Sequence, residues 1–240
     1  MVITRIDPEG CRALSGRRYS RPSVMRPALL ALLAALPLLA ACARDAPPSR
    51  PADGQPAVGG REVGQCLATL RENRSRFSTV PDQRFAPGCG ISGAVVLSSL
   101  GADEGQIGLS NLGLVACPLA AKFNAWARFG VDRAARQTLG SPVARIETMG
   151  SYACRNVAGT GRLSAHSQAR AIDIAGFTLA DGRRVSVLSD WSGGTQEERR
   201  FLRVVHQSAC KRFGTVLGPD YNAAHRDHLH LEEGDGSFCR

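Results

Sequence analysis

Two stretches of the chain decide its fold: LSAHSQARAIDIAGF at Leu163–Phe177 and HRDHLHLE at His225–Glu232. Together they contain four of the five histidines of the 240-residue sequence. The first includes the apolar run AIDIAG, which predicts a strand with Asp173 inside it. The second alternates polar and apolar residues and predicts another strand, in which His228 and His230 leave the same face.

These two patterns indicate a bound metal ion. A carboxylate inside an apolar strand is costly unless it is paired or coordinates a metal. Two imidazoles about 7 Å apart on one strand face are unusual for a packed core. A first-row divalent ion explains both features, because zinc binds imidazole nitrogen and carboxylate oxygen, and a catalytic zinc keeps three protein ligands plus water. Strand parity places Asp227 on the face opposite to the two histidines.

Hydrophobic periodicity elsewhere predicts further helices and strands. The pair Thr195 and Glu198 forms a capping-box pattern at the start of one helix, and Pro118 suits the first turn of another. The expected helices cover residues 65–74, 117–139 and 195–213, and the expected strands cover residues 90–97, 143–152, 170–177, 184–188 and 227–232. Because turns rather than regular helical crossovers connect the strands, the pattern favours an α+β fold with an antiparallel sheet.

Composition places the chain in an ordinary globular class. Hydrophobic residues make up 43% and charged residues 21%, which excludes a disordered chain or one with many membrane spans. The net charge is +9, of which residues 1–41 supply a surplus of four, from six arginines and two acidic residues. The sequence contains no basic run with interleaved aromatic residues, so nucleic-acid binding is not expected. The remaining positive surplus fits either an acidic polymer or no particular partner.

The N-terminal region predicts export and a lipid anchor. The apolar run Pro27–Ala41 has the length of a signal-peptide core and is short for a membrane span. It leads into Leu39–Cys42, which resembles the bacterial lipobox, so Cys42 is expected to carry the lipid. The alternative is a cleaved secretory signal with an incidental cysteine. The residue after Cys42 is Ala43, whereas an aspartate there would resemble an inner-membrane retention signal. We therefore expect the protein at the periplasmic face of the outer membrane of a Gram-negative bacterium.

The segments around this signal complete the expected organisation. Met25 and Arg26 directly precede the signal core, so residues 1–24 are predicted to be an extension upstream of the true start codon, and residues 25–41 the signal peptide. Residues 42–63 hold Cys42 and a stretch rich in Pro, Ala, Gly and charge, which predicts a flexible tether. One domain is expected over residues 64–240, long enough to bury a core, and anchored to a membrane without spanning it.

Cysteine usage agrees with an oxidising compartment. Apart from Cys11 and the lipobox Cys42, an even number remains: Cys66, Cys89, Cys117, Cys154, Cys210 and Cys239. We expect three disulfides among them. The sequence leaves fifteen pairings open. Sequence proximity alone favours Cys66–Cys89, Cys117–Cys154 and Cys210–Cys239.

The motif His-x6-Asp followed by Asp-His-x-His resembles the LAS family of zinc peptidases. That family includes lysostaphin-type enzymes, D-Ala-D-Ala carboxypeptidases and penicillin-insensitive murein endopeptidases. Residues 66–232 resemble more closely the extensin-like C-terminal domain family of bacterial proteins, through SYACRN, LSAHSQARAIDIAGF, FGTVLGPDYN and HRDHLHLE. The resemblance implies an LAS-type metallopeptidase fold, with an antiparallel sheet flanked by helices.

The resemblance also implies a set of zinc ligands. His166 and Asp173 correspond to the first two ligands, and His230 to the third. His228 corresponds to a histidine beside the metal that orients or stabilises the reacting groups. Ala169 stands where these peptidases usually have glycine, and its methyl group is expected to narrow the turn or the cleft.

Further positions correspond to residues that act on the substrate. Asp227 stands where D-Ala-D-Ala carboxypeptidases have the acid that serves as general base, and His225 resembles the extra histidine of the murein endopeptidases. Arg155 resembles the arginine that holds a substrate carboxylate or the developing oxyanion. Asp190 and Tyr221 are weaker candidates for supporting the site.

The resemblance therefore implies a zinc-dependent peptidoglycan peptidase that acts on stem-peptide cross-links. The alternative is an inactive, zinc-bearing protein that binds the cell wall or serves as a scaffold, which Ala169 motivates. A zinc-buffering role fits less well, because such a protein would carry a histidine-rich tract. The remaining histidine, His206, lies in an expected helix and is interpreted as a structural residue.

Overall fold

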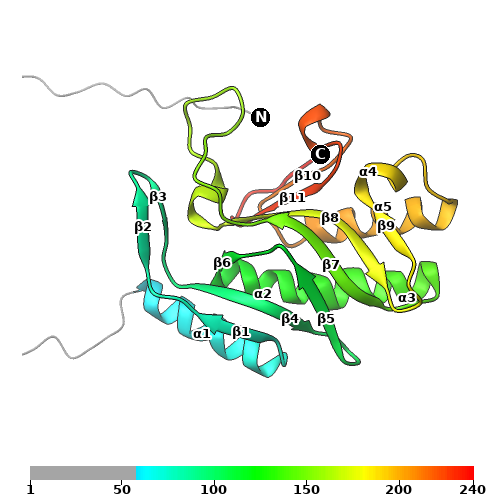
Figure 1. The fold of residues 1–240 in the computed structure, drawn as a ribbon, viewed down its shortest axis with the longest axis horizontal. Helices are drawn as coiled ribbons and strands as arrows, with labels where there is room; N and C mark the ends of the chain where they lie inside the picture. The colour runs from blue at the N-terminus through cyan, green and yellow to red at the C-terminus, as the bar shows by residue number, and fades with distance from the viewer. Residues whose placement is uncertain (1–57) are drawn as a thin grey trace, which may run out of the picture. The chain divides into compact units, whose positions relative to one another are not determined.

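The computed structural model describes residues 58–240, which form one large sheet, a small hairpin and several helices (Figure 1). The strands are β1 (Arg76–Thr79), β2 (Gln83–Ala86), β3 (Cys89–Ile91), β4 (Ala94–Gly101), β5 (Gln106–Ser110), β6 (Leu114–Ala116), β7 (Val143–Gly150), β8 (Ala171–Leu179), β9 (Arg184–Ser186), β10 (Thr215–Leu217), β11 (Leu229–Glu232) and β12 (Phe238–Cys239). The α-helices are α1 (Val58–Glu72), α2 (Cys117–Trp126), α3 (Arg133–Leu139), α4 (Val187–Asp190) and α5 (Gln196–Cys210).

The large sheet has the strand order β1-β4-β5-β7-β8-β11-β10-β12, with β6 paired to β4 and β9 paired to β8. Its neighbouring strands are antiparallel except for two parallel pairs, β5 with β7 and β10 with β12. Strands β2 and β3 form a separate antiparallel hairpin. The predicted α+β class is therefore confirmed, with a sheet that is mostly rather than wholly antiparallel.

The core lies between the sheet and the helices. In Figure 1, helices α2, α3 and α5 lie behind the sheet, and α1 packs against α2. Trp126 from α2 and Phe177 from β8 are fully buried, with ring centroids 6.3 Å apart. Phe177 also contacts Phe201 from α5 at 5.2 Å. These aromatic contacts join the sheet to two helices and hold β8 firmly in the middle of the domain.

The two long predicted helices are present. Residues 117–139 form α2, a π-helical turn η1 (Ala127–Asp132) and α3, and this run ends at Gly140 in the left-handed conformation. Helix α5 begins with the predicted capping box. The Thr195 side chain accepts a hydrogen bond from the Glu198 backbone, and the Glu198 carboxylate accepts one from the Thr195 backbone.

The strands expected over residues 143–152 and 170–177 are present as β7 and β8 with ends shifted by one or two residues, and the strand expected over 184–188 ends at Ser186, where helix α4 follows. The two other predicted strands differ more. The strand expected over residues 90–97 is divided, because Asp82 accepts hydrogen bonds from the Ser92 hydroxyl and the Gly93 backbone and Gly93 adopts a positive φ of 56°. The strand expected over residues 227–232 begins at Leu229, so Asp227 precedes it. It is also followed by β12, which pairs in parallel with β10.

The N-terminal predictions fall largely on residues that the structure does not describe. These include the upstream extension, the signal core, Cys42 and the tether as far as residue 57. Helix α1 begins at Val58, inside the stretch predicted as tether, so regular structure is present before residue 64. Among residues 58–240, no helix is long and apolar enough to cross a bilayer.

The predicted three disulfides are confirmed, but two of the predicted pairings are wrong. The structure joins Cys66–Cys117, Cys89–Cys154 and Cys210–Cys239. Packing of α1 on α2 brings the Cα atoms of Cys66 and Cys117 to 5.8 Å. Cys89 begins β3, which lies beside the loop after β7 that carries Cys154. Pairing therefore follows the packing of elements and not distance along the sequence.

Candidate metal centre

The centre of the site is a cross-strand pair. Strands β8 and β11 are antiparallel, and their register places Asp173 directly opposite His230. Residues opposed in this way lie close enough for their side chains to interact. The Oδ1 atom of Asp173 lies 2.9 Å from Nδ1 of His230. Both residues are buried, with 9% and 8% of their surface exposed.

The third residue, His166, comes from a short 3₁₀ turn before β8, η2 (Ala165–Gln168). The hydroxyl of Ser164 caps this turn by accepting the His166 backbone N–H. The Nδ1 atom of His166 lies 2.6 Å from the carbonyl oxygen of Ser151, to which it can only donate. Its Nε2 atom lies 3.2 Å from Oδ2 of Asp173 and 3.3 Å from Nδ1 of His230.

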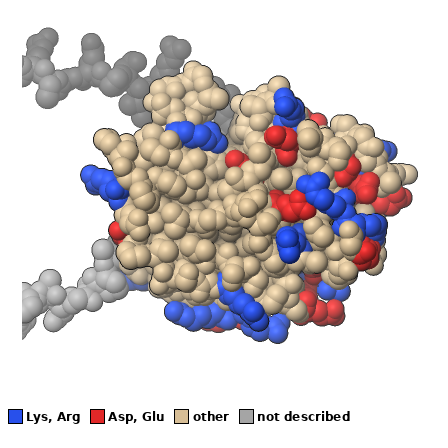
Figure 2. Space-filling view, in the orientation of Figure 1, with Lys and Arg blue, Asp and Glu red and all other residues tan. Residues whose placement is uncertain are grey.

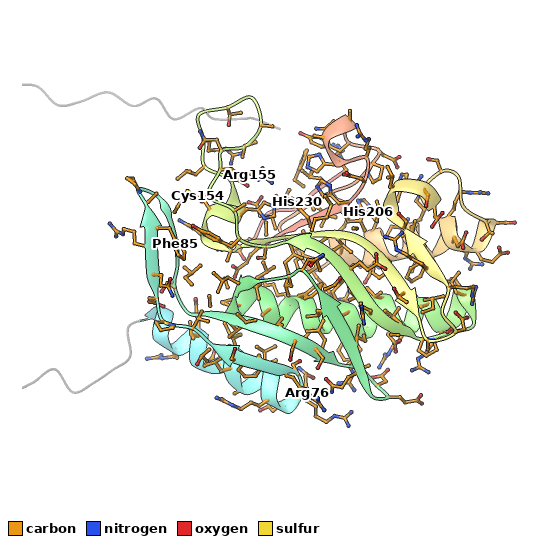
Figure 3. The ribbon with its side chains drawn as sticks, viewed as in Figure 1. Arg76, Phe85, Cys154, Arg155, His206 and His230 are labelled. Atoms are coloured by element: carbon orange, nitrogen blue, oxygen red, sulfur yellow. A yellow bond between two sulfur atoms is a disulfide. The ribbon has the colours of Figure 1, made fainter. Side chains whose placement is uncertain are left out.

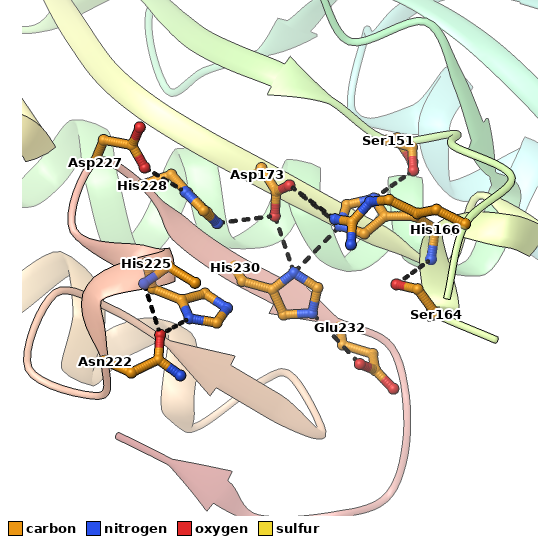
Figure 4. A network of polar contacts seen from close by, with 12 residues as sticks. Ser151, Ser164, His166, Asp173, Asn222, His225, Asp227, His228, His230 and Glu232 are labelled. Atoms are coloured by element: carbon orange, nitrogen blue, oxygen red, sulfur yellow. Dashed lines mark hydrogen bonds and ion pairs between the residues drawn. The ribbon is translucent and has the colours of Figure 1, made fainter. Parts of the chain in front are cut away.

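Each site histidine has one ring nitrogen next to an oxygen acceptor (Figure 4). The acceptors are the Ser151 carbonyl for His166, the Asn222 carboxamide for His225, the Asp227 carboxylate for His228 and the Glu232 carboxylate for His230. In a neutral ring such an acceptor holds the proton on the nitrogen that faces it, so that the other nitrogen can bind a metal ion. For His166 and His230 these other nitrogens are Nε2 and Nδ1, the two that converge on Asp173.

The buried charges shift one another's protonation in the metal-free protein. Burial raises the pKa of Asp173, but hydrogen bonds from His166 and His230 outweigh this and hold the pKa well below its usual range. Burial lowers the pKa of His230, but its bonds to Asp173 and Glu232 outweigh this and raise it to about 9. The carboxylates of Asp173 and Glu232 therefore favour positive charge at His230.

The donor atoms fit a zinc ion. His166 Nε2, His230 Nδ1 and the Asp173 carboxylate lie within 4.8 Å of one another. Their shortest separations are 2.9, 3.2 and 3.3 Å. Two ligands about 2.0–2.1 Å from a tetrahedral zinc ion are about 3.3 Å apart, and imidazole and carboxylate are ligands that zinc accepts. The three residues predicted as ligands are therefore brought together in a suitable geometry.

The structure also places the four other predicted site residues around this group. Nε2 of His228 lies 3.7 Å from Oδ1 of Asp173, and the half-exposed Arg155 has Nη2 4.0 Å from Oδ2 of the same carboxylate. The ring of His225 lies beside the rings of His228 and His230, at centroid distances of 5.1 and 6.0 Å. Burial and the neighbouring imidazoles lower the pKa of His225 to about 4.

Asp227 takes a different position from the one that strand parity predicts. It lies before β11, and its Oδ1 atom accepts a hydrogen bond from Nδ1 of His228 at 2.9 Å. That bond lowers the pKa of the Asp227 carboxyl. Asp227 therefore orients the ring of His228, which in turn lies beside Asp173.

Of the weaker candidates, one joins the site and one does not. The ring of Tyr221 packs edge-on against His225 at 5.5 Å. Asp190 instead accepts hydrogen bonds from the Ser186 backbone and the Ser189 hydroxyl, within the turn around α4. It closes that turn and makes no hydrogen bond or ion pair with His166, Asp173 or His230. His206 packs against Trp191 at 5.6 Å, in agreement with a structural role.

The walls of the site come from two loops. One loop, residues 151–164, carries Arg155 and is fixed by the Cys89–Cys154 disulfide, as Figure 3 shows, with His230 on the sheet beside it. The other, residues 218–228, carries Tyr221 and His225. Figure 2 shows a notch in the upper outline of the surface between these two lobes, whereas charged residues gather along the lower and right edges.

Three contributors to the site were not predicted from the sequence. Glu232 lies two residues after His230, and its Oε2 is 3.4 Å from Nε2 of that ring. Strand alternation could have indicated this, because positions two apart share a face. Asn222 begins a 3₁₀ turn η3 (Ala223–His225) as its N-cap, a role typical of asparagine. The Ser151 carbonyl is a backbone group, which no residue pattern identifies.

Replacing Glu232 by glutamine is expected to weaken zinc binding about 10- to 100-fold, the usual cost of losing a partner that orients a metal-bound histidine. The change removes the negative charge from the acceptor of the His230 Nε2 proton. A competition titration with a chromophoric chelator measures the affinity. Glu233→Gln is the matched control, because Glu233 pairs with Arg170 instead. Equal zinc affinities in the two variants would contradict the role of Glu232.

The position of Ala169 explains why glycine suits it. Ala169 has φ 55° and ψ 32°, in the left-handed region. Its methyl group is buried in an apolar cluster with Ile91 and Ala94, which contains none of the metal-centre residues. Ala169 therefore adopts a strained left-handed conformation, and its methyl group packs into this apolar cluster.

Ala169→Gly is expected to change the free energy of unfolding by less than about 1 kcal/mol. The substitution relieves a left-handed alanine, worth about 1–2 kcal/mol, and loses a buried methyl group, worth about 0.8 kcal/mol, together with the entropic cost of glycine. Urea unfolding measures the difference, and zinc content should stay unchanged. A loss above about 2 kcal/mol would show that methyl packing dominates at this position.

A second group of possible ligands lies elsewhere in the described residues. His206, Cys210 and Cys239 bring their donor atoms within 4.8 Å of one another. Cys210 and Cys239 form a disulfide, however, and thiolates rather than disulfide sulfurs are the metal ligands that cysteine provides. The Nε2 atom of His206 faces the backbone oxygen of Arg240 at 3.2 Å. This group therefore fastens the C-terminal strand.

Comparison with known proteins identifies a family. A comparison with curated proteins found no match, and a comparison with solved structures found none either. The sequence model of one family, described as the C-terminus of extensin-like proteins, matches residues 64–240. This match covers the sheet, the helices from within α1 onward, and every residue of the metal centre. The chain therefore belongs to the extensin-like protein C-terminus family.

Proposed function

We propose that this protein is a zinc-dependent peptidase with an LAS-type fold, acting on the stem-peptide cross-links of peptidoglycan. The observation that carries the proposal is the convergence of His166, Asp173 and His230 at separations of 2.9–3.3 Å. A structural zinc site is closed by four protein ligands, whereas a catalytic one leaves a position for water. Here three protein donors converge, which supports a catalytic site with a position left for water.

The surrounding residues suit hydrolysis of an amide. When bound, zinc would polarise a peptide carbonyl and activate water. Arg155 and His228 stand beside Asp173 and would offset negative charge on the carbonyl oxygen as it develops. Stem peptides carry carboxylates, which the half-exposed Arg155 guanidinium would hold.

We assign the general base to His225. Its ring lies against those of His228 and His230, and it is held neutral because its pKa is about 4. A neutral imidazole would accept the proton of the attacking water and return it to the leaving amine. Asp227 is the other candidate, but its carboxylate is occupied by the His228 ring. Its part in the reaction would therefore be to orient His228.

The proposed location is the periplasm, with a lipid on Cys42. Three disulfides support an oxidising compartment, and the cell wall lies there. The competing proposal, an inactive zinc-bearing wall protein, was motivated by Ala169. Because the methyl of Ala169 packs against Ile91 and Ala94, it supplies no obstacle to the metal-centre residues.

Digestion of cross-linked muropeptides by the purified, zinc-loaded protein tests the proposal. We expect monomeric products, loss of activity with a chelator, and recovery on adding zinc. His225→Ala should keep zinc and lose rate by about 10²–10⁴-fold, as expected for a general base, while Asp227→Ala should lose less. A larger loss in Asp227→Ala would move the base to that residue. Zinc binding without any digestion would favour the inactive wall-binding protein.

A further inference from the structure

Asn222 occupies an unusual position beside the proposed base. Its Oδ1 atom lies 3.0 Å from the backbone nitrogen of Ala224 and 2.7 Å from Nδ1 of His225. A backbone N–H can only donate a hydrogen bond, so the side-chain atom that faces it must be the carboxamide oxygen and not the nitrogen. The orientation of the Asn222 amide is thereby fixed by the backbone.

This orientation fixes the proton on His225. Because the Asn222 oxygen can only accept, Nδ1 of His225 must carry a hydrogen. The neutral ring then has its lone pair on Nε2. Figure 4 shows the second ring nitrogen of His225 directed away from Asn222, on the side of His230. Asn222 therefore directs the basic nitrogen of His225 toward the metal centre.

The ring of His225 is also held from its other sides. Tyr221 contacts it edge-on at 5.5 Å, and the rings of His228 and His230 lie at 5.1 and 6.0 Å. These contacts restrict the ring plane but do not select a tautomer, because none of them is a hydrogen bond. Of the contacts that the structure records for this ring, the one with Asn222 is the hydrogen bond that can do so.

We propose that Asn222 is a positioning residue that holds His225 in the tautomer with the proton on Nδ1, so that Nε2 serves as the base. This inference rests on the proposed peptidase function. In the reaction, Nε2 takes a proton from water as the hydroxyl oxygen bonds to the carbonyl carbon. The imidazolium keeps its Nδ1–H bond to Asn222. The Nε2 proton then passes to the amide nitrogen as the C–N bond breaks.

The decisive readout is independent of peptidase activity. Nitrogen-15 NMR of the imidazole rings in the zinc-loaded protein distinguishes protonated from unprotonated nitrogens, and His225→Ala identifies the signals of this ring. We expect a protonated Nδ1 and an unprotonated Nε2 in the wild type and in Asn222→Asp, which keeps the acceptor. Asn222→Ala should shift the proton toward Nε2. A wild-type ring with its proton on Nε2 would overturn the inference, whether or not the protein digests peptidoglycan.

Kinetics supply the second readout. Asn222→Ala should lower kcat about 10- to 100-fold, as for other residues that orient a functional histidine, with unchanged zinc content and little change in KM. In a His225→Ala background it should have no further effect. Thr195→Ala is the matched control, because it removes the cap of α5 without touching the site. An unchanged kcat in folded Asn222→Ala would overturn the inference, and muropeptide binding without any digestion would instead sink the proposed function.

Discussion

Replacing His166 by alanine is expected to abolish both zinc binding and hydrolysis. His166 is 2% exposed, and its Nε2 atom is one of only three convergent donors. The variant would leave Asp173 and His230, too few ligands for a catalytic zinc site. Zinc content after dialysis and the rate of muropeptide digestion measure the effect, and both should fall to the level of the chelator-treated protein.

The matched control for this change is His206→Ala. His206 is a partly buried histidine of the same domain that bonds the backbone of Arg240 and packs on Trp191. This variant should keep its zinc and its activity once folded. Zinc retained at the wild-type level in His166→Ala would show that the ion binds elsewhere and would remove the basis of the proposed mechanism.

Removal of the Cys66–Cys117 disulfide is expected to have the largest effect on stability. The two residues are 51 apart in sequence, and loop closure over that length is worth about 4 kcal/mol. Both sulfurs are buried in the main core, where they join α1 to α2. For a domain of this size, the Tm of Cys66→Ala/Cys117→Ala should fall by about 8–16 °C.

A second double variant, Cys210→Ala/Cys239→Ala, provides the comparison. Its cysteines are 29 apart and only partly buried. The shorter loop lowers the entropic term by about 0.5 kcal/mol, and less cavity is left behind. Denaturant unfolding of both variants should therefore rank the Cys66–Cys117 pair as the more stabilising one. The reverse order would show that the C-terminal strand contributes more stability than the α1–α2 contact.

Two of the three residues that converge in the candidate centre, Asp173 and His230, could be singled out from the sequence because their signals are local. Asp173 lies inside an apolar strand, and histidines alternate near the C-terminus. Burying such groups without a partner costs free energy, so the pattern indicates a site rather than an ordinary core. The capping box at Thr195 and the position of Pro118 are likewise set by a few neighbouring residues. These features can be predicted without knowledge of tertiary contacts, because they depend only on residues that are close together in the sequence.

Other features depend on contacts between distant segments. The register that places Asp173 opposite His230 is not encoded in either strand alone. The pairing of Cys66 with Cys117 follows from the packing of two helices. The small strands β1, β6 and β12 are too short for periodicity to identify.

Asp227 shows how a strand boundary changes the expected position of a side chain. With a strand starting at residue 227, parity would place its side chain on the face away from the histidines. The strand actually starts at Leu229, and the turn before it directs the carboxylate to the His228 ring. The choice between Asp227 and His225 as base therefore depends on two residues at the end of one strand.

The most direct test of the central claim is the zinc content of the purified protein, measured by elemental analysis beside Asp173→Ala. The control is Asp181→Ala, which removes an aspartate that pairs with Arg183 far from the site. We predict about one zinc per chain in the wild type and in the control, and none in Asp173→Ala. Absence of bound zinc from the wild type, even after reconstitution, would contradict the account.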